Sequence, residues 1–276
     1  MTEPTTQARF PRSTATPSGP GAAERRRLIV LVLSVLLVAS VGVNAYLVHI
    51  GHGYEKAANS VRLDPGGLRM YASERAKPRG DDPLLVFFGD SRIAMWPAPA
   101  FATGYRIVNR GIGYQTTAQM LVRIDADLAS LQPNVVVLEA GVNDLKTIAD
   151  FPARRGEIVA DCEANLARIV QRCHEMRARV VLVTVFAIGD VAPWRAPFWS
   201  NDVRVAVREV NAFLPSLVGD KDVLFDANAV LVDEHGDVRR PFQVDYLHLS
   251  PAGYAALNEA LQPALSAILA GQARTR

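Results

Sequence analysis

A serine, an aspartate and a histidine are the residues of this sequence whose types and spacing suit nucleophilic catalysis. Ser91 follows a glycine and an aspartate at the end of the apolar run 84–88. Asp245 and His248 stand three residues apart near the C-terminus, as on one side of a helical turn, where the carboxylate can orient the imidazole. Histidine titrates near neutral pH and can take a serine proton. Taken alone, Ser91 fits an ordinary turn after a glycine at least as well.

Two further polar stretches follow predicted strands. The segment 109–117, NRGIGYQTT, opens a predicted helix, and its backbone N–H groups can stabilise negative charge. It is a weak match to the dinucleotide-binding motif, because Thr116 stands where the third glycine belongs. Asn143 follows the apolar run 135–138 and is either a turn residue or an amide donor directed at the space that Ser91 faces. All these groups are expected at the carboxyl edge of one sheet, where open α/β sheets bind ligands.

The elements that must position these residues alternate between strand and helix. Apolar runs predict strands at 84–88, 106–108, 135–138, 180–185 and 223–225. Helices are expected at 116–131, 157–177, 202–217 and 251–270. This alternation is typical of a parallel sheet covered by helices on both faces, within one domain spanning residues 84–270.

The uncharged run 28–50 predicts a membrane-spanning helix. At ~1.5 Å per residue it would extend roughly 34 Å, enough to cross a bilayer core of ~30 Å. We expect an uncleaved anchor; a cleaved signal peptide, giving a secreted protein, is the alternative. Residues 1–24 are rich in Thr, Pro, Ala, Gly and Ser and have almost no large apolar side chains, so residues 1–27 are expected to be a disordered tail. Three arginines precede the run, so the positive-inside rule places this tail in the cytoplasm and the catalytic domain outside it. Residues 51–83 are expected to be a connector, and 271–276 a short tail.

Charge, cysteine and histidine content exclude several classes of function. The chain carries a net charge of +2, but residues 1–27 contribute +3, which leaves the remainder near −1. Nucleic-acid binding is therefore not expected. Cys162 and Cys173 fall on one face of a predicted helix, roughly 16 Å apart at ~1.5 Å per residue, too far for a disulfide, so we expect buried thiols. The remaining histidines form no metal-binding motif.

The four motifs, in this order along the chain, resemble the SGNH or GDSL-type hydrolase family over residues 84–270. The resemblance implies a flavodoxin-like α/β/α sandwich that acts as an esterase or lipase without metal or other cofactor. By position, it implies Ser91 as nucleophile, His248 as general base and Asp245 as the orienting acid. It also implies an oxyanion hole formed by Asn143, the Ser91 backbone N–H and a backbone N–H of the second motif. In this second motif the sequence departs from the family pattern: Tyr114 stands where a glycine is expected, and Gly113 lies one residue before that position. If this position needs a positive φ, tyrosine is strained there.

Substrate and acceptor stay open at this point. A lipid, small-molecule or acylated-glycan ester fits the motifs, and so does transfer of the acyl group to a sugar or lipid hydroxyl. A non-catalytic glycan-binding protein is a weaker alternative, because all four polar residues are retained. The oligomeric state is not predicted. Six side chains are candidates for the rim of the cleft, with core packing as the alternative for each: Arg92, Trp96, Trp194, Arg195, Phe198 and Trp199.

Overall fold

The computed structural model describes residues 21–74, 82–100 and 105–273. Most of the predicted N-terminal tail, residues 75–81 of the predicted connector and the end of the C-terminal tail lie outside the described residues. The chain forms two compact units, Met1–Asn59 and Ser60–Arg276.

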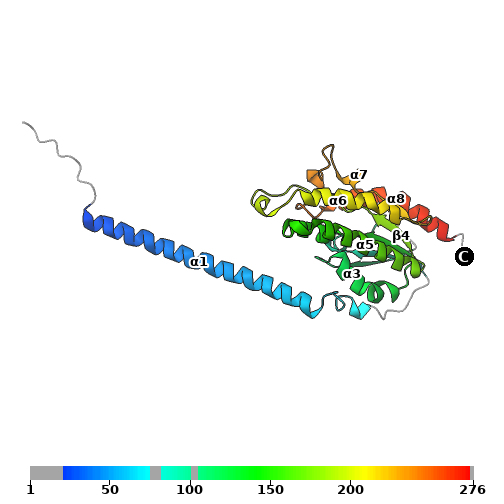
Figure 1. Ribbon diagram of the computed structural model, residues 1–276, viewed down its shortest axis with the longest axis horizontal. Helices are drawn as coiled ribbons and strands as arrows, with labels where there is room; N and C mark the ends of the chain where they lie inside the picture. Colours follow the sequence, from blue (N-terminus) through cyan, green and yellow to red (C-terminus); the bar gives the residue numbers. More distant parts are fainter. Residues whose placement is uncertain (1–20, 75–81, 101–104, 274–276) are drawn as a thin grey trace, which may run out of the picture. The chain divides into compact units, whose positions relative to one another are not determined.

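Helix α1 (Ala22–Leu63) occupies the described part of the first unit and enters the second (Figure 1). It begins before the apolar run because Ala22, Ala23 and the arginines that follow are good helix formers. It continues beyond residue 50 until Pro65, which disfavours helical backbone at Asp64. None of its side chains is buried, and its apolar stretch is long enough to be either a membrane anchor or a signal sequence.

The second unit contains a five-stranded parallel sheet in the order β2-β1-β3-β4-β5. Its strands are β1 (Leu84–Gly89), β2 (Arg106–Gly111), β3 (Val135–Glu139), β4 (Arg179–Val183) and β5 (Val223–Phe225). Its longer helices are α3 (Thr117–Ile124), α5 (Arg155–Glu175), α6 (Asp202–Phe213) and α8 (Pro251–Ala273). The one-turn helices are α2 (Ser91–Ala94), α4 (Val142–Leu145) and α7 (Asn228–Leu231). The predicted α/β sandwich with a central parallel sheet is confirmed.

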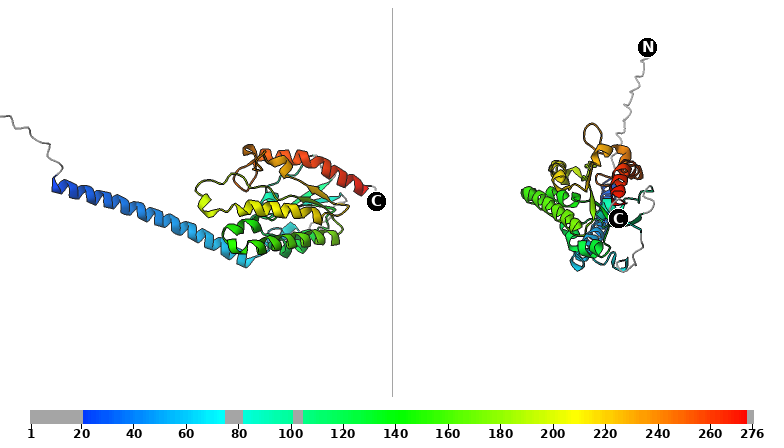
Figure 2. Two further views of the ribbon diagram at one scale, coloured as in Figure 1. Left: turned by 45° about the horizontal axis from the view of Figure 1, so that its top comes forward. Right: turned by 90° about the vertical axis from the view of Figure 1, so that its right-hand side faces the viewer.

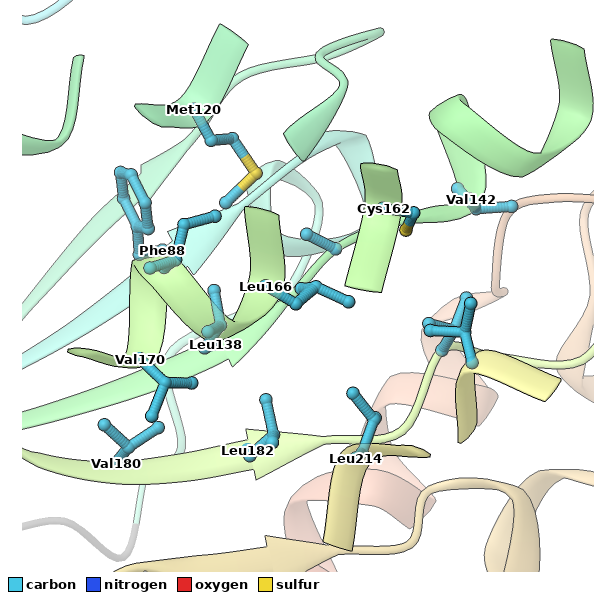
Figure 3. Packing of buried hydrophobic residues seen from close by; sticks show 14 of the residues in the cluster. Phe88, Met120, Leu138, Val142, Cys162, Leu166, Val170, Val180, Leu182 and Leu214 are labelled. Carbon is cyan, nitrogen blue, oxygen red and sulfur yellow. The ribbon is translucent and has the colours of Figure 1, made fainter. Parts of the chain in front are cut away.

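Helices cover both faces of the sheet, and β1 and β3 supply side chains to both cores. Helices α3, α5 and α6 pack on one face, and α8 packs on the other (Figure 2). The short helices α2 and α7 add Ile93 and Leu231 to the core under α8. Figure 3 shows the first core, where Phe88 and Leu138 of the strands meet Met120 of α3 and Leu166 of α5. Strands buried on both faces are continuously apolar, which explains why the predicted strand positions agree with the structure to within a few residues.

Both cysteines lie on the buried face of α5, as predicted. Cys162 and Cys173 are fully buried free thiols. Burial raises the pKa of both, to about 12 for Cys173. They act as small apolar side chains in the core that Figure 3 shows around Cys162.

Residues 64–74, which we call the connecting segment, belong to the second unit and pack against the end of β2. The segment carries a short 3-10 helix (Ala72–Glu74), and the Tyr71 hydroxyl donates to the Gly111 carbonyl (2.6 Å). The Arg110 guanidinium lies over the Tyr71 ring and pairs with Glu74 (2.8 Å). This part of the predicted connector is therefore fixed to the end of β2, immediately before the loop that contains Tyr114.

Candidate active site

Ser91 stands at the first position of α2, directly beyond the carboxyl end of β1. Gly89 makes this turn possible: a Cβ at position 89 would lie 2.1 Å from the Glu139 carbonyl oxygen on the adjacent strand. Asp90 then caps α2, its Oδ1 accepting the Arg92 backbone N–H (2.9 Å). The strand end and the cap together hold the serine hydroxyl at the sheet edge, where it is partly exposed.

The structure brings Ser91, His248 and Asp245 into one hydrogen-bonded row. His248 Nε2 lies 3.0 Å from Ser91 Oγ, and His248 Nδ1 lies 2.9 Å from Asp245 Oδ2. The histidine side chain is 25% exposed, so one side of the row remains open to a substrate. These distances allow proton transfer from the hydroxyl to the imidazole.

The segment that carries the acid and the base is an open loop, and the expected helical turn is wrong. The carboxylate shapes this loop itself: Asp245 Oδ1 accepts the backbone N–H groups of Leu247 (2.7 Å) and His248 (2.8 Å). Burial opposes ionisation of Asp245, but the hydrogen bonds from the His248 ring and from the two amides together keep the pKa of this carboxyl below its usual value. It is therefore ionised at neutral pH.

Asn143 lies buried on α4, beside the serine turn. Its amide nitrogen donates to the Gln115 carbonyl (3.0 Å) and, over a longer distance, to Asp90 Oδ2 (3.3 Å). Both hydrogens thus have acceptors within the protein. To donate to a substrate, the amide would exchange one of these bonds, and the long one to Asp90 is the weaker.

The loop between β2 and α3 approaches the serine from the other side. A Cβ built on Gly113 would lie 3.9 Å from Ser91 Cβ, so this backbone borders the nucleophile. Tyr114 has a φ of +66°, the strained conformation considered from the sequence. Tyr114 is 83% exposed, and the Lys146 ammonium lies 5.4 Å from the centroid of its ring. The tyrosine side chain therefore stands outward at the surface.

A buried charged cluster beneath the serine escaped the sequence analysis. Arg92 is fully buried; its Nε donates to the Leu247 carbonyl (2.9 Å), beside His248, and its Nη1 lies 3.4 Å from Glu139 Oε1. Burial, reinforced by the charge of Asp90, raises the pKa of Glu139 to about 8. Arg92 thus ties the serine turn to the histidine loop. The sequence signal was the presence of charged residues shortly after two buried apolar runs, Asp90 and Arg92 after 84–88 and Glu139 after 135–138.

A second buried network joins the serine strand to the connecting segment. Arg123, fully buried, donates to the carbonyl oxygens of Gly89 (2.9 Å) and Arg110 (2.8 Å) and to Gln115 Oε1 (2.5 Å). The Gln115 side-chain amide in turn donates to the Gly66 carbonyl (2.8 Å). The Gln115 backbone carbonyl also accepts a hydrogen bond from the Asn143 amide. This network therefore connects Gly66 to Asn143, the candidate oxyanion donor.

The six rim candidates divide into buried and exposed groups. For Arg92 and Trp96 the rim interpretation is wrong: both are buried, Trp96 packing between Phe87, Phe186 and Tyr254. Trp194 and Phe198 are largely exposed in the loop after β4. Trp199 packs edge-on against Tyr246, and Arg195 donates to the Tyr246 hydroxyl (2.8 Å).

No cluster of three or more His, Cys, Asp or Glu side chains suited to a metal ion occurs among residues 21–74, 82–100 and 105–273. The chemistry available at this sheet edge is that of a hydroxyl, an imidazole, a carboxylate and amide donors.

The structure is a flavodoxin-like α/β/α sandwich with a serine, a histidine and an aspartate at one sheet edge, and comparison with known proteins identifies the family. Residues 79–256 match the model of the GDSL-like lipase/acylhydrolase family. The chain belongs to this family, whose members are esterases and acylhydrolases.

Similar proteins include two curated enzymes and a solved structure. The chain is 27% identical over 206 residues to platelet-activating factor acetylhydrolase IB subunit alpha1 of Homo sapiens, covering 71% of this chain and 80% of that one. It is 28% identical over 166 residues to esterase TesA of Pseudomonas aeruginosa, covering 60% and 72%. A GDSL-like lipase from Bacteroides thetaiotaomicron has the same fold, with a TM-score of 0.59, 22% identity and coverage of 73% and 98%.

Proposed function

We propose that this protein is a serine esterase that cleaves carboxylic esters through an acyl-enzyme intermediate. The observation that carries the proposal is the continuous row from Asp245 through His248 to Ser91, with distances of 2.9 and 3.0 Å. In the first step, His248 Nε2 takes the hydroxyl proton while Ser91 Oγ bonds to the ester carbonyl carbon. The tetrahedral intermediate then collapses, and the alcohol leaves with the proton from His248. Water, deprotonated by the same imidazole, releases the acid and regenerates the serine.

The negative charge of the tetrahedral intermediate needs donors, and three groups border the serine. We assign this role to Asn143, to the Ser91 backbone N–H and to the backbone N–H of Tyr114, with Gly113 as the alternative in the same loop. Asn143 would exchange its long bond to Asp90 for the oxyanion. Support comes from its burial beside the serine turn and from the approach of Gly113 to Ser91 Cβ.

The acyl group is proposed to be short. The acetylhydrolase named above is a relative whose name specifies an acetyl group, and it aligns with most of this chain. A chain-length series of aryl esters, measured beside acetylated glycans, tests this proposal. Activity that rises from acetate toward long-chain esters would contradict it. Addition of sugar or lipid alcohols to the same assay separates hydrolysis from acyl transfer, because only a transferase yields the new ester.

The nucleophile is tested by covalent labelling. A fluorophosphonate probe should label the wild-type chain and leave Ser91→Ala unlabelled, and the substitution should abolish ester hydrolysis. Ser250 is a matched control, because it is also a serine at a helix start but its hydroxyl donates to the Pro241 carbonyl (2.6 Å). Labelling that persists in Ser91→Ala would overturn the assignment.

We further propose that α1 anchors the protein in the cytoplasmic membrane with the catalytic domain outside. Support comes from the exposed apolar stretch of α1 and from the three arginines that precede it. Retention of the full-length chain in membranes after alkaline carbonate washing is the expected result. A shorter, soluble chain found outside the cell would instead support a cleaved signal sequence.

A further inference from the structure

Two cationic side chains on segments that border Ser91, those of Lys146 and Arg195, form no ion pair with the carboxylates that the structure describes. Lys146 follows Asn143 by three residues, is half-buried, and has no carboxylate within ion-pair distance among the described residues. By contrast, the buried arginines Arg92, Arg110 and Arg123 are all paired with acidic side chains. Removing an ammonium from water without a counter-ion costs free energy. An incoming anion would therefore be stabilised by pairing with Lys146.

Arg195 lies exposed on the loop after β4. Its guanidinium lies 4.8 Å from the centroid of the Tyr246 ring and donates to the Tyr246 hydroxyl (2.8 Å). Tyr246 directly follows the catalytic candidate Asp245, so Arg195 is held against the histidine loop. Like Lys146, Arg195 forms no ion pair with the carboxylates that the structure describes.

The segments that hold the two cations both border Ser91. Tyr114, whose ring lies against Lys146, follows Gly113, and a Cβ on Gly113 would lie 3.9 Å from Ser91 Cβ. Tyr246, whose ring lies against Arg195, is two residues before His248, whose Nε2 lies 3.0 Å from Ser91 Oγ. Burial lowers the pKa of Lys146, and the positive charges of Arg195 and Arg92 lower it further, while the negative charges of Asp90 and Asp150 oppose this shift. Asp90 is the neighbour of Ser91, which places Lys146 within electrostatic range of the serine turn. Two tyrosines frame the pair: the Tyr114 ring contacts the Lys146 ammonium, and the Tyr246 ring contacts Arg195. Aromatic faces hold cations without neutralising them, so both charges remain available.

We propose that Lys146 and Arg195 form a binding site for a negatively charged group of the substrate, a phosphate or a carboxylate carried near the ester bond. The proposal rests on the assignment of Ser91 as nucleophile. It narrows the substrate from carboxylic esters in general to anionic esters. Lys146, close to the serine turn, would contact the anion as a point charge, and the planar guanidinium of Arg195 would contact two of its oxygens.

A matched pair of esters tests the charge requirement. The acetyl esters of 4-hydroxybenzoate and of methyl 4-hydroxybenzoate differ by one negative charge. The measured quantity is the ratio of kcat/KM for the anionic ester to kcat/KM for the neutral ester. This ratio should be about tenfold higher in the wild-type chain than in Lys146→Gln, because the variant loses one charge-assisted hydrogen bond. The double variant with Arg195→Gln should lower the ratio further, and Lys146→Arg should largely preserve it.

The control for net charge is Lys221→Gln, an exposed lysine in the turn before β5, at the opposite edge of the sheet. It should leave the ratio of the two esters unchanged. Added salt should reduce the preference in the wild type more than in the double variant. An unchanged ratio in Lys146→Gln and in the double variant would overturn the proposal, as would an equal fall with both esters.

The anion has two possible sources, a soluble ester or a lipid headgroup. A 2-acetyl glycerophospholipid in neutral detergent micelles provides the second arm. A Lys146→Gln effect on the soluble pair assigns the site to free anionic esters, and an effect confined to micelles assigns it to a headgroup phosphate. Both outcomes support the anion site, and no effect in either arm refutes it. Absence of hydrolysis of every ester by the wild-type chain would instead refute the proposed esterase function.

Discussion

The substitution Asp245→Asn separates the geometry of the catalytic row from its electrostatics. In the wild type, Asp245 Oδ1 accepts two backbone N–H groups at 2.7 and 2.8 Å, and Oδ2 accepts from His248 Nδ1. An amide at this position keeps its oxygen on the two backbone donors, so its NH₂ group must point at the imidazole. It then donates to Nδ1, which moves the ring hydrogen to Nε2, where a free lone pair is needed for the serine proton.

The size of the effect follows from these bonds. Rotating the amide to restore the correct tautomer would leave two backbone N–H groups facing an NH₂ group, at a cost of about 3 kcal/mol. The productive orientation is then populated roughly once in 100 molecules. Loss of the carboxylate charge that stabilises the imidazolium adds to this, so kcat should fall by about 10³–10⁴.

The assay is aryl acetate hydrolysis by the purified full-length chain, with thermal unfolding measured in parallel. Because the loop keeps both backbone hydrogen bonds, Asp245→Asn should unfold close to the wild-type temperature, whereas Asp245→Ala should also lose stability. A kcat within tenfold of the wild type, at unchanged stability, would refute the assignment of Asp245 as the orienting acid.

Three other substitutions address the neighbouring groups. Asn143→Ala should lower kcat by roughly 10²–10³ with the fold intact, and wild-type turnover would remove Asn143 from the oxyanion hole. Tyr114→Gly should raise the free energy of unfolding by about 0.5–1 kcal/mol, since glycine tolerates a φ of +66°; Tyr114→Ala keeps the strain and is the control. Burial raises the pKa of Glu139 to about 8. Between about pH 4.5 and 8 this carboxyl is therefore protonated in the folded chain and ionised in the unfolded chain, so the free energy of unfolding should fall as the pH rises through this range. Glu139→Gln should flatten that slope in urea denaturation, and an identical slope would contradict the raised pKa.

The sheet could be predicted because its strands are buried on both faces and therefore appear as uninterrupted apolar runs. Boundaries moved by a few residues where a run ends in a polar side chain, as at Glu139, which extends β3 past its last apolar residue. The length of α1 was underestimated because the residues after 50 are polar and helical, a combination that hydropathy does not detect.

The candidate site was only partly visible in the sequence. The order of the motifs placed Ser91, Asn143, Asp245 and His248 at one sheet edge. A spacing of three residues between acid and base fits a helical turn and an open loop equally, so the loop geometry needed the structure. The buried contact between Arg92 and Glu139 was missed because pairing between residues far apart in sequence leaves no periodic pattern.

The connecting segment also limits the distance between the apolar run of α1 and the catalytic domain. Its hydrogen bonds fix residues 65 and 66 to the domain, so only residues 51–64 separate the apolar run from a rigid attachment point. As helix these residues span about 21 Å, and fully extended no more than about 50 Å. With α1 in a bilayer, this reach would confine the serine to a thin layer beside the membrane. The rate at which Ser91 meets ester substrates would then depend on the number of esters per unit of membrane area, and far less on the ester concentration in the surrounding fluid.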